Sequence, residues 1–156
     1  MPEFVVNTGE IAVGRDDALI RTGSVGSCVV IVLYDGQAKV GGLAHALLPS
    51  RPKNDPKLPE ETPAKFADEA VDRLIAEIEK IGGQKERLRS KLVGGAQMFK
   101  ILGGDRHGIG YQNAESARNK LRSLAIPIDG EDIGGTVGRI VEFNVRNGLV
   151  ETVTKM

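Results

Sequence analysis

The only cysteine and one of the two histidines of this 156-residue sequence lie in neighbouring apolar stretches. Cys28 follows a loop of small residues, 23–27, and directly precedes the apolar run 29–34. His45 lies in a second apolar run, 40–48, after a short polar turn. A thiol becomes a strong nucleophile when a neighbouring base takes its proton, and an imidazole can be that base. The pair therefore indicates thiol chemistry, if the fold brings the two side chains together.

A β-hairpin would bring them together. The first run is apolar and largely β-branched at every position, which is typical of a strand buried on both faces, and the second run is its expected antiparallel partner. A two-residue turn at Gly36 and Gln37, with Gly36 at the position that needs a positive φ, places Cys28 directly opposite His45. Opposed side chains in such a pair lie about 4.5–5.5 Å apart at Cβ.

Other interpretations stay open at this point. A different turn, or a bulge at Gly41 and Gly42, would shift the pairing by a residue. A lone cysteine is more often a small buried hydrophobe, and a core histidine with a satisfied ring is the ordinary alternative for the imidazole. The reactive interpretation is favoured by the backbone N–H groups at Gly26 and Ser27 and by the upstream hydroxyl of Thr22, which is able to hydrogen-bond the imidazole.

The remaining elements predict an α+β fold, a layered sandwich with largely antiparallel sheets formed by one domain over 1–156. An amphipathic helix is expected from Thr62, as N-cap, and Pro63 to the glycines at 82–83. A second helix is expected over 112–124. Further strands are predicted at 4–13 with a break at 7–9, at 18–22, at 89–99 with a glycine-rich end, at 126–131, and in a hairpin of 139–145 with 149–153.

Composition excludes several functional classes. The net charge is zero, and the chain has no Trp, two Tyr and four Phe, so we expect no nucleic-acid partner. One cysteine and two histidines are too few for the usual Cys/His zinc site, and no cofactor or metal is expected. The sequence has neither a signal peptide nor an apolar stretch of about 20 residues, which predicts a cytoplasmic protein without membrane insertion.

Two loops require separate interpretation. Five of the seven prolines fall in 49–63, directly after the second apolar run, and this segment is either a solvated connection or a mobile flap over the site. The glycine-rich loop 102–110 contains His107. It lacks the Gly-Lys-Ser/Thr ending of a phosphate-binding loop, and His107 is expected to be solvated without a catalytic role.

The motifs together resemble the chemotaxis protein CheD family, the chemoreceptor glutamine deamidases. The resemblance runs in order along nearly the whole chain, from Gly26-Ser-Cys-Val through Gly41-Gly-x-x-His-x-x-Leu-Pro49 and Gly94-Gly-Ala-x-Met-Phe99 to Ile109-Gly-x-x-Asn113 and Glu131-Asp-x-Gly-Gly135. Gly23-Ser24 replaces the commoner Leu-Gly, and Thr136 stands where Asn is commoner.

The resemblance implies a Cys–His–Thr site on an α/β/α sandwich similar to the catalytic domain of the cytotoxic necrotizing factor deamidases. Cys28 would be the nucleophile, His45 the base and acid, and Thr22 the group that orients His45, with Gly26 and Ser27 near the oxyanion. It also implies that the substrates are glutamine side chains on the cytoplasmic helices of methyl-accepting chemoreceptors, and that the phosphatase CheC is a partner in some organisms.

Two alternatives to deamidation remain. One is a related thiol enzyme, such as a transglutaminase, an amidase or a receptor methylesterase. The other is a non-catalytic adaptor that binds receptors or CheC and in which Cys28 is merely buried.

Overall fold

The computed structural model describes residues 1–97 and 108–155, which form nine strands, two α-helices and one 3₁₀ turn. In chain order the elements are β1 (Glu3–Val6), β2 (Ile11–Arg15), β3 (Leu19–Thr22), β4 (Val29–Asp35), β5 (Val40–Ala46), α1 (Ala67–Lys80), η1 (Lys85–Arg87), β6 (Arg89–Gly94), α2 (Ile109–Ser123), β7 (Ile128–Ile133), β8 (Gly138–Asn144) and β9 (Leu149–Lys155). Three predictions are confirmed: strands within 4–13 with a break at 7–9, a strand at 18–22, and a C-terminal hairpin.

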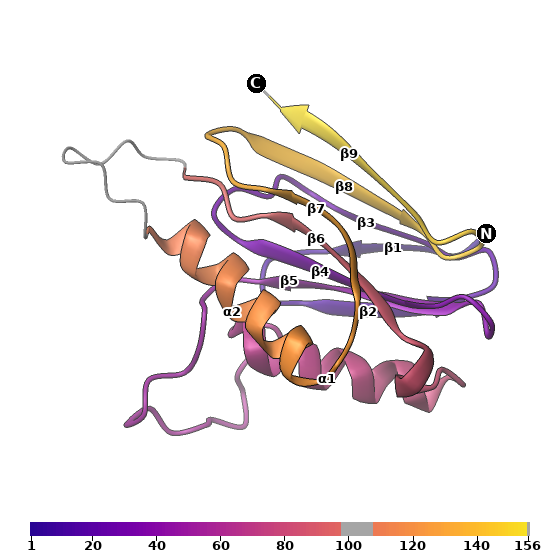
Figure 1. Cartoon of the computed structure of the whole chain (residues 1–156), viewed down its shortest axis with the longest axis horizontal. Coiled ribbons are helices and arrows are strands. Elements are labelled where there is room, and N and C mark those ends of the chain that lie inside the picture. The colour runs from indigo at the N-terminus through magenta and orange to yellow at the C-terminus, as the bar shows by residue number, and fades with distance from the viewer. Residues whose placement is uncertain (98–107, 156) are drawn as a thin grey trace.

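The strands form two sheets in the order β1-β3-β8-β9 and β2-β5-β4-β6-β7. All neighbours are antiparallel except β1 with β3 and β6 with β7. This confirms an α+β fold with largely antiparallel sheets. Within the described ranges both helices lie on the same face of the five-stranded sheet (Figure 1). The layer order is therefore helices, five-stranded sheet, four-stranded sheet, rather than α/β/α.

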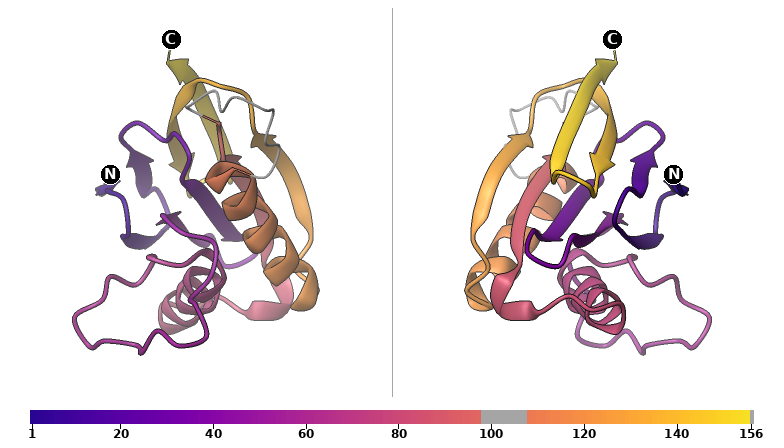
Figure 2. Two further views of the ribbon diagram at one scale, coloured as in Figure 1. Left: turned by 90° about the vertical axis from the view of Figure 1, so that its left-hand side faces the viewer. Right: turned by 90° about the vertical axis from the view of Figure 1, so that its right-hand side faces the viewer.

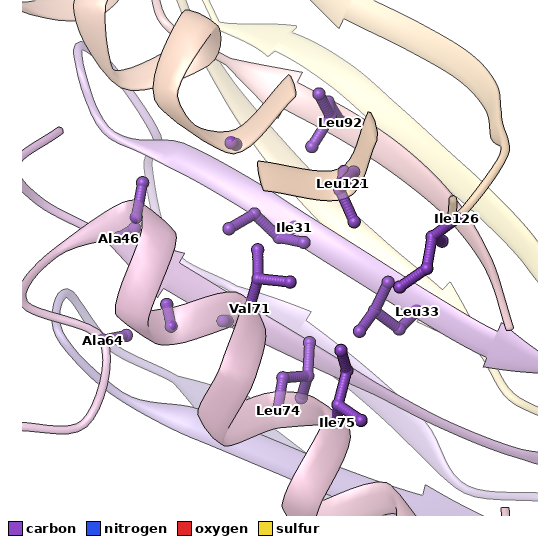
Figure 3. Packing of buried hydrophobic residues seen from close by; sticks show 14 of the residues in the cluster. Ile31, Leu33, Ala46, Ala64, Val71, Leu74, Ile75, Leu92, Leu121 and Ile126 are labelled. Carbon is purple, nitrogen blue, oxygen red and sulfur yellow. The ribbon is translucent and has the colours of Figure 1, made fainter. Parts of the chain in front are cut away.

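Two apolar clusters fill the spaces between these layers. The cluster between helices and sheet includes Ile31 and Leu33 of β4, with Val71 and Leu74 of α1 and Leu121 of α2 (Figure 3). The cluster between the two sheets contains alternate residues of β4 (Val30 and Val32) and Leu43 of β5. From the four-stranded sheet it contains Ile20, Val141 and Phe143. Because successive side chains of a strand point to opposite faces, β4 must be apolar at nearly every position.

The hairpin register differs from the predicted one. The last pair is Asp35 with Val40, so residues 36–39 form the turn and His45 lies opposite Val30. The prediction that Cys28 lies directly opposite His45 is therefore wrong. The physical cause of the different register is the Asp35 carboxylate. It accepts hydrogen bonds from the backbone N–H groups of residues 37 and 38 at 3.1 Å and so stabilises a longer turn. Positive φ falls on Lys39 instead of Gly36.

The predicted start of α1 is also wrong. The helix begins at Ala67 after Phe66 and has no side-chain cap, so Thr62 is not its N-cap. The backbone before the helix pairs elsewhere, because Ala67 N–H donates to Leu48 O at 2.8 Å and Ala64 N–H donates to Gly9 O at 2.9 Å. These bonds attach the segment to the chain beyond β5, at Leu48, and to the turn between β1 and β2, at Gly9. The helix ends at Lys80 before Gly82, which has φ +106°.

Residues 98–107 lie outside the described ranges, and with them the predicted strand end at Phe99, most of the predicted loop and His107. Of that loop, Ile109 and Gly110 form the first residues of α2 and are not loop. The predicted strand at 89–99 corresponds to β6 up to Gly94.

The proline-rich connection between β5 and α1 is attached to α1 through Arg51. Its guanidinium donates to the Glu69 carboxylate at 2.9 Å and to the Pro56 carbonyl at 3.0 Å, also pairs with Glu61, and lies 4.5 Å from the Phe66 ring centroid. Figure 2 shows the connection as an open loop beside α1. These contacts favour a tethered connection over a flap.

The glycine pair of β5 brings three layers close together without a bulge. A Cβ at Gly41 would lie 2.8 Å from the Phe143 ring on the four-stranded sheet, and a Cβ at Gly42 would lie 2.7 Å from Leu74 of α1 and 2.9 Å from the Ala12 carbonyl. The register of β4 with β5 continues through both residues. The pair therefore sets the distance from the five-stranded sheet to both of its neighbours.

We expect Gly42→Ala to destabilise the fold by about 1–3 kcal/mol, because the added methyl group overpacks the contact between sheet and helix. Urea denaturation measures the change. Gly23→Ala is the matched control, since a Cβ there meets nothing within 4 Å, and should change stability by less than about 0.5 kcal/mol. Equal stability of the two variants would contradict this explanation of the glycine pair.

Candidate active site

Cys28 lies immediately before β4, with its side chain in the cluster between the two sheets. Its exposed fraction is 9%, so the thiol lies at the boundary between core and solvent. The loop that leads to it begins at the end of β3, crosses to β8 through the pairing of Val25 with Arg139, and then enters β4. This path places the cysteine at the end of the five-stranded sheet where β4 begins.

Four consecutive carbonyl groups of this loop accept hydrogen bonds from four different donors. Val25 O accepts from Arg139 N at 2.9 Å, Gly26 O from Ala96 N at 3.0 Å, Ser27 O from Asn113 Nδ2 at 2.9 Å, and Cys28 O from Gly95 N at 2.7 Å. The carbonyl direction of each peptide is thereby fixed. In a trans peptide the N–H of the next residue points the opposite way. Within the described ranges, the N–H groups of residues 26–28 donate to no backbone carbonyl.

The glycines after β6 allow this close approach. Gly94 has φ +112°, and a Cβ there would lie 2.4 Å from the Cys28 carbonyl oxygen. Gly95 has φ +62°, and a Cβ there would lie 2.8 Å from the Gly110 carbonyl oxygen of α2. Glycine at this strand end therefore allows two backbones to approach closely.

His45 lies on β5 with its side chain on the same face of the sheet as Leu43, toward the space between the sheets. It is 2% exposed. Because Val30 lies opposite His45 and Cys28 precedes Val30 by two residues, the thiol and the imidazole are diagonal neighbours on one face. The two-residue shift in register thus preserves the shared face, although it removes the direct opposition.

The backbone of His45 is fixed while its ring is not. Its N–H donates to Glu10 O at 3.1 Å, and its carbonyl accepts from Gly9 N at 2.8 Å. Neither ring nitrogen makes a hydrogen bond within the described part of the chain. The backbone carbonyl of Val6, at the end of β1, acts on the ring by raising its pKa, against the larger effect of burial. A buried imidazole with two unpaired nitrogens is unusual for a core histidine and requires an explanation.

Thr22 is buried at the end of β3, on the four-stranded sheet. Its hydroxyl donates to Gly23 O at 2.7 Å and accepts from Val141 N at 3.2 Å. The hydroxyl is therefore engaged with its own sheet and not with the imidazole. Thr22 pairs with Val6, the residue whose carbonyl influences His45, so the threonine lies one strand away from that carbonyl.

Thr8 was not predicted as a site residue. This residue is in the turn between β1 and β2, and its hydroxyl interacts with the Cys28 thiol. The only signal in the sequence was the strand break at 7–9, which gives no direction to a side chain. Asn113 was also missed as a site residue, although it appears in one of the family motifs.

Both titratable groups are neutral in the free protein. Burial raises the pKa of the Cys28 thiol above its ordinary value of 9.0, and the Thr8 hydroxyl and the backbone N–H of Cys28 oppose that change. Burial lowers the pKa of His45 below its ordinary value of 6.5, and the Val6 carbonyl acts in the other direction. Near pH 7 the site therefore contains a thiol and a free imidazole base.

Over residues 1–97 and 108–155, no three His, Cys, Asp or Glu side chains form a group that could bind a metal ion. Within the same residues, no helix combines the length and the apolar character needed to span a membrane.

A thiol and an imidazole on one sheet face, beside a loop whose carbonyl groups are engaged, resemble the arrangement used by thiol-dependent hydrolases and acyl-transfer enzymes. Comparison with known proteins identifies the family. The family model described as CheD chemotactic sensory transduction matches residues 47–154. This chain belongs to the CheD family, which confirms the resemblance inferred from its motifs.

The similarity to individual relatives extends over residues 23–28, the loop that contains Cys28 (called the nucleophile loop below, after its proposed role). The chain is 41% identical over 148 residues to a probable chemoreceptor glutamine deamidase CheD of Pyrococcus abyssi, covering 95% of this chain and 89% of the relative. It is 47% identical over 126 residues to the chemoreceptor glutamine deamidase CheD of Halalkalibacterium halodurans, covering 80% and 76%. The Pyrococcus horikoshii relative is 41% identical, with 96% and 91% covered.

We expect alkylation of Cys28 by iodoacetamide to accelerate with pH through a midpoint above 9.0, because burial disfavours the thiolate. Thr8→Val should move the midpoint higher still, since it removes a hydroxyl that lowers the thiol pKa. Thr154→Val, on the exposed face of β9, is the control and should leave it unchanged. A wild-type midpoint below 9.0 would show instead that a preformed thiolate exists in the free protein.

Proposed function

We propose that this protein is a chemoreceptor glutamine deamidase, formed by one domain over 1–156, which hydrolyses receptor glutamine side chains to glutamate and releases ammonia. The names and coverage of the relatives support the reaction and its substrate. The observation that carries the mechanism is that Cys28 and His45 share one sheet face, beside a loop whose carbonyls are all engaged.

The reaction begins at the carboxamide carbon of the substrate glutamine. The Cys28 sulfur attacks that carbon as His45 takes the thiol proton, giving a tetrahedral intermediate with a negatively charged oxygen. Backbone N–H groups near Gly26, Ser27 and Cys28 donate to this oxygen, and one such donor is typically worth about 10²–10³ in rate. His45 then gives its proton to the departing nitrogen, and ammonia leaves.

A thioester between Cys28 and the substrate acyl group remains. His45 takes a proton from a water molecule as that water attacks the thioester carbon, and the collapse of the second intermediate expels the sulfur. The sulfur recovers the proton from His45, and the product is a glutamate side chain. The complete reaction consumes one water and releases one ammonia, with no change in oxidation state and no cofactor.

The electrostatics favour general-base attack over a preformed ion pair. Burial lowers the pKa of His45 and raises that of Cys28, so neither group carries a charge before substrate binds. Proton transfer must then accompany formation of the sulfur–carbon bond. The unpaired nitrogens of His45 are consistent with this role, because a base needs one nitrogen free to accept the thiol proton.

Thr22 is proposed as the group that orients His45 during the reaction, in the place that a carboxylate or an Asn takes in other triads. In the free protein its hydroxyl bonds Gly23 O and Val141 N. The role therefore requires the O–H to turn from the Gly23 carbonyl toward the ring. The location of Thr22 beside Val6, on the sheet that faces His45, supports this proposal.

Cys28→Ala should abolish ammonia release from purified receptor cytoplasmic fragments, and His45→Ala should reduce it by at least about 10³-fold, because the first removes the nucleophile and the second the base. Mass spectrometry should show a gain of about one dalton at the modified glutamines, as replacement of an amide by an acid requires, without an amine adduct.

Gly23→Ala is the control in the same loop and should retain activity. Full activity of Cys28→Ala would exclude the thiol mechanism. Receptor binding without ammonia release by the wild-type protein would favour the adaptor, an amine adduct would favour a transglutaminase, and release of methanol from methylated receptor would favour a methylesterase.

Thr22→Val should lower kcat by about 10-fold or more, because valine keeps the shape and removes the hydroxyl, whereas Thr22→Ser should retain most of the activity. The valine variant also loses the acceptor for Val141 N–H, which should cost about 1 kcal/mol of stability. Unfolding by urea measures that effect separately. A loss of stability with unchanged kcat would limit Thr22 to a structural role.

The partners follow from the proposed reaction. The substrate glutamines would lie on the cytoplasmic helices of methyl-accepting receptors, which places the enzyme in the cytoplasm, and the connection after Pro49 would flank the bound helix. CheC remains a proposed partner on the strength of the family resemblance. The similarity of the fold to the catalytic domain of the cytotoxic necrotizing factor deamidases is likewise a proposal from that resemblance.

A further inference from the structure

A buried amide of α2 joins the two halves of the candidate site. Asn113 is 0% exposed, and its Nδ2 donates to the Ser27 carbonyl at 2.9 Å and to the Leu47 carbonyl at 3.0 Å. The first acceptor belongs to the residue before Cys28, and the second belongs to the residue two positions after His45. One side chain therefore connects the nucleophile loop to the chain that leaves β5.

The orientation of this amide is determined by its partners. Both acceptors are carbonyl oxygens, so they require two N–H donors, and only the NH₂ end of Asn113 provides them. The reversed amide would place Oδ1 against two carbonyls. In the observed orientation Oδ1 is buried without a partner among the described residues. The side chain thus satisfies both backbone carbonyls while its own acceptor stays unsatisfied, which makes packing alone a poor explanation for an asparagine here.

The hydrogen bond from Asn113 to the Ser27 carbonyl also fixes the direction of the Cys28 N–H. Ser27 O and Cys28 N belong to the same planar trans peptide, in which C=O and N–H point in opposite directions. A donor that fixes the carbonyl therefore fixes the N–H. The carbonyl points toward α2, so the N–H of Cys28 points away from α2, and this N–H interacts with the thiol of its own residue.

We infer that Asn113 is a positioning residue for the reaction: by binding the Ser27 carbonyl it directs the Cys28 N–H toward the oxyanion that forms beside the thiol. The inference rests on the proposed thiol mechanism and adds to it the side chain that orients one oxyanion donor. Among the described residues, the Asn113 amide hydrogen-bonds backbone carbonyls and not the imidazole. Its second bond, to Leu47 O, connects the same helix to the chain directly after β5, the strand that contains His45.

Close packing at the start of α2 supports this role. A Cβ at Gly110 would lie 2.4 Å from the Ala96 carbonyl oxygen, so the glycine lets the helix approach the segment after β6. That segment supplies Ala96 N–H to Gly26 O and Gly95 N–H to Cys28 O. The backbone bonds and the Asn113 bond therefore belong to one packed unit around the loop.

The test compares deamidation with alkylation in Asn113→Ala and in the nearly isosteric Asn113→Asp. Deamidation of receptor fragments needs an oxyanion donor, whereas displacement of iodide from iodoacetamide forms no oxyanion. We expect kcat for ammonia release to fall about 10- to 100-fold, with KM changed less than about twofold. The limiting alkylation rate at pH above the thiol midpoint should change less than about twofold. All rates are expressed per folded protein, measured by circular dichroism.

Ser116→Ala is the matched control on the same helix. Its hydroxyl donates to Pro49 O at 2.5 Å, so the variant loses a bond between α2 and the chain after β5 without affecting the nucleophile loop. Its kcat should stay within about twofold of wild type.

Three results would overturn the inference: unchanged kcat in both Asn113 variants, an equal fall of kcat in Ser116→Ala, or a fall in alkylation as large as the fall in kcat. Failure of the thiol mechanism itself is recognised separately, by activity of Cys28→Ala in the same assay.

Discussion

The hydrogen bonds to four consecutive carbonyls, from Val25 to Cys28, are the constraint on which the candidate site depends. A loop of small residues has little side-chain packing of its own, and fixing each of its residues costs about 1–2 kcal/mol of backbone entropy. Donors from β8, from the segment after β6 and from α2 offset that cost. The carbonyl sides of these peptides are thereby engaged with protein, and their N–H sides face the other way, as the proposed oxyanion site requires.

Much of the fold could be predicted from the sequence because its signals are local. The all-apolar run before Asp35 indicated a doubly buried strand, and the periodicity up to Ile81 indicated α1. The errors arose where tertiary contacts decide. The Asp35 carboxylate lengthened the hairpin turn, and pairing of the backbone around Phe66 with the chain beyond β5 delayed the start of α1. Neither contact has a signature within a short window of sequence.

The candidate site shows the same division. Cys28 and His45 could be chosen from the sequence because a two-residue shift in an antiparallel pair leaves side chains on the same face. Thr8 and Asn113 could not be chosen, since the first reaches the thiol from a turn of the N-terminal strands and the second from a helix 85 residues farther along. Thr22 was predicted beside the imidazole, but its hydroxyl bonds its own sheet, because the partners of a rotating hydroxyl depend on neighbouring backbone that the sequence does not place.

The backbone bonds of His45 to Gly9 and Glu10 have a consequence for how the protein loses activity. These residues lead into β2, which is an edge strand of the five-stranded sheet and has one strand neighbour, β5. Edge strands open locally at lower free energy than central strands, so fraying of β2 would release His45, the proposed base, while β4 still held Cys28 in place. Inactivation on warming would then begin as a local event at the sheet edge, and slow amide exchange at β4 would persist after fast exchange had appeared at β2.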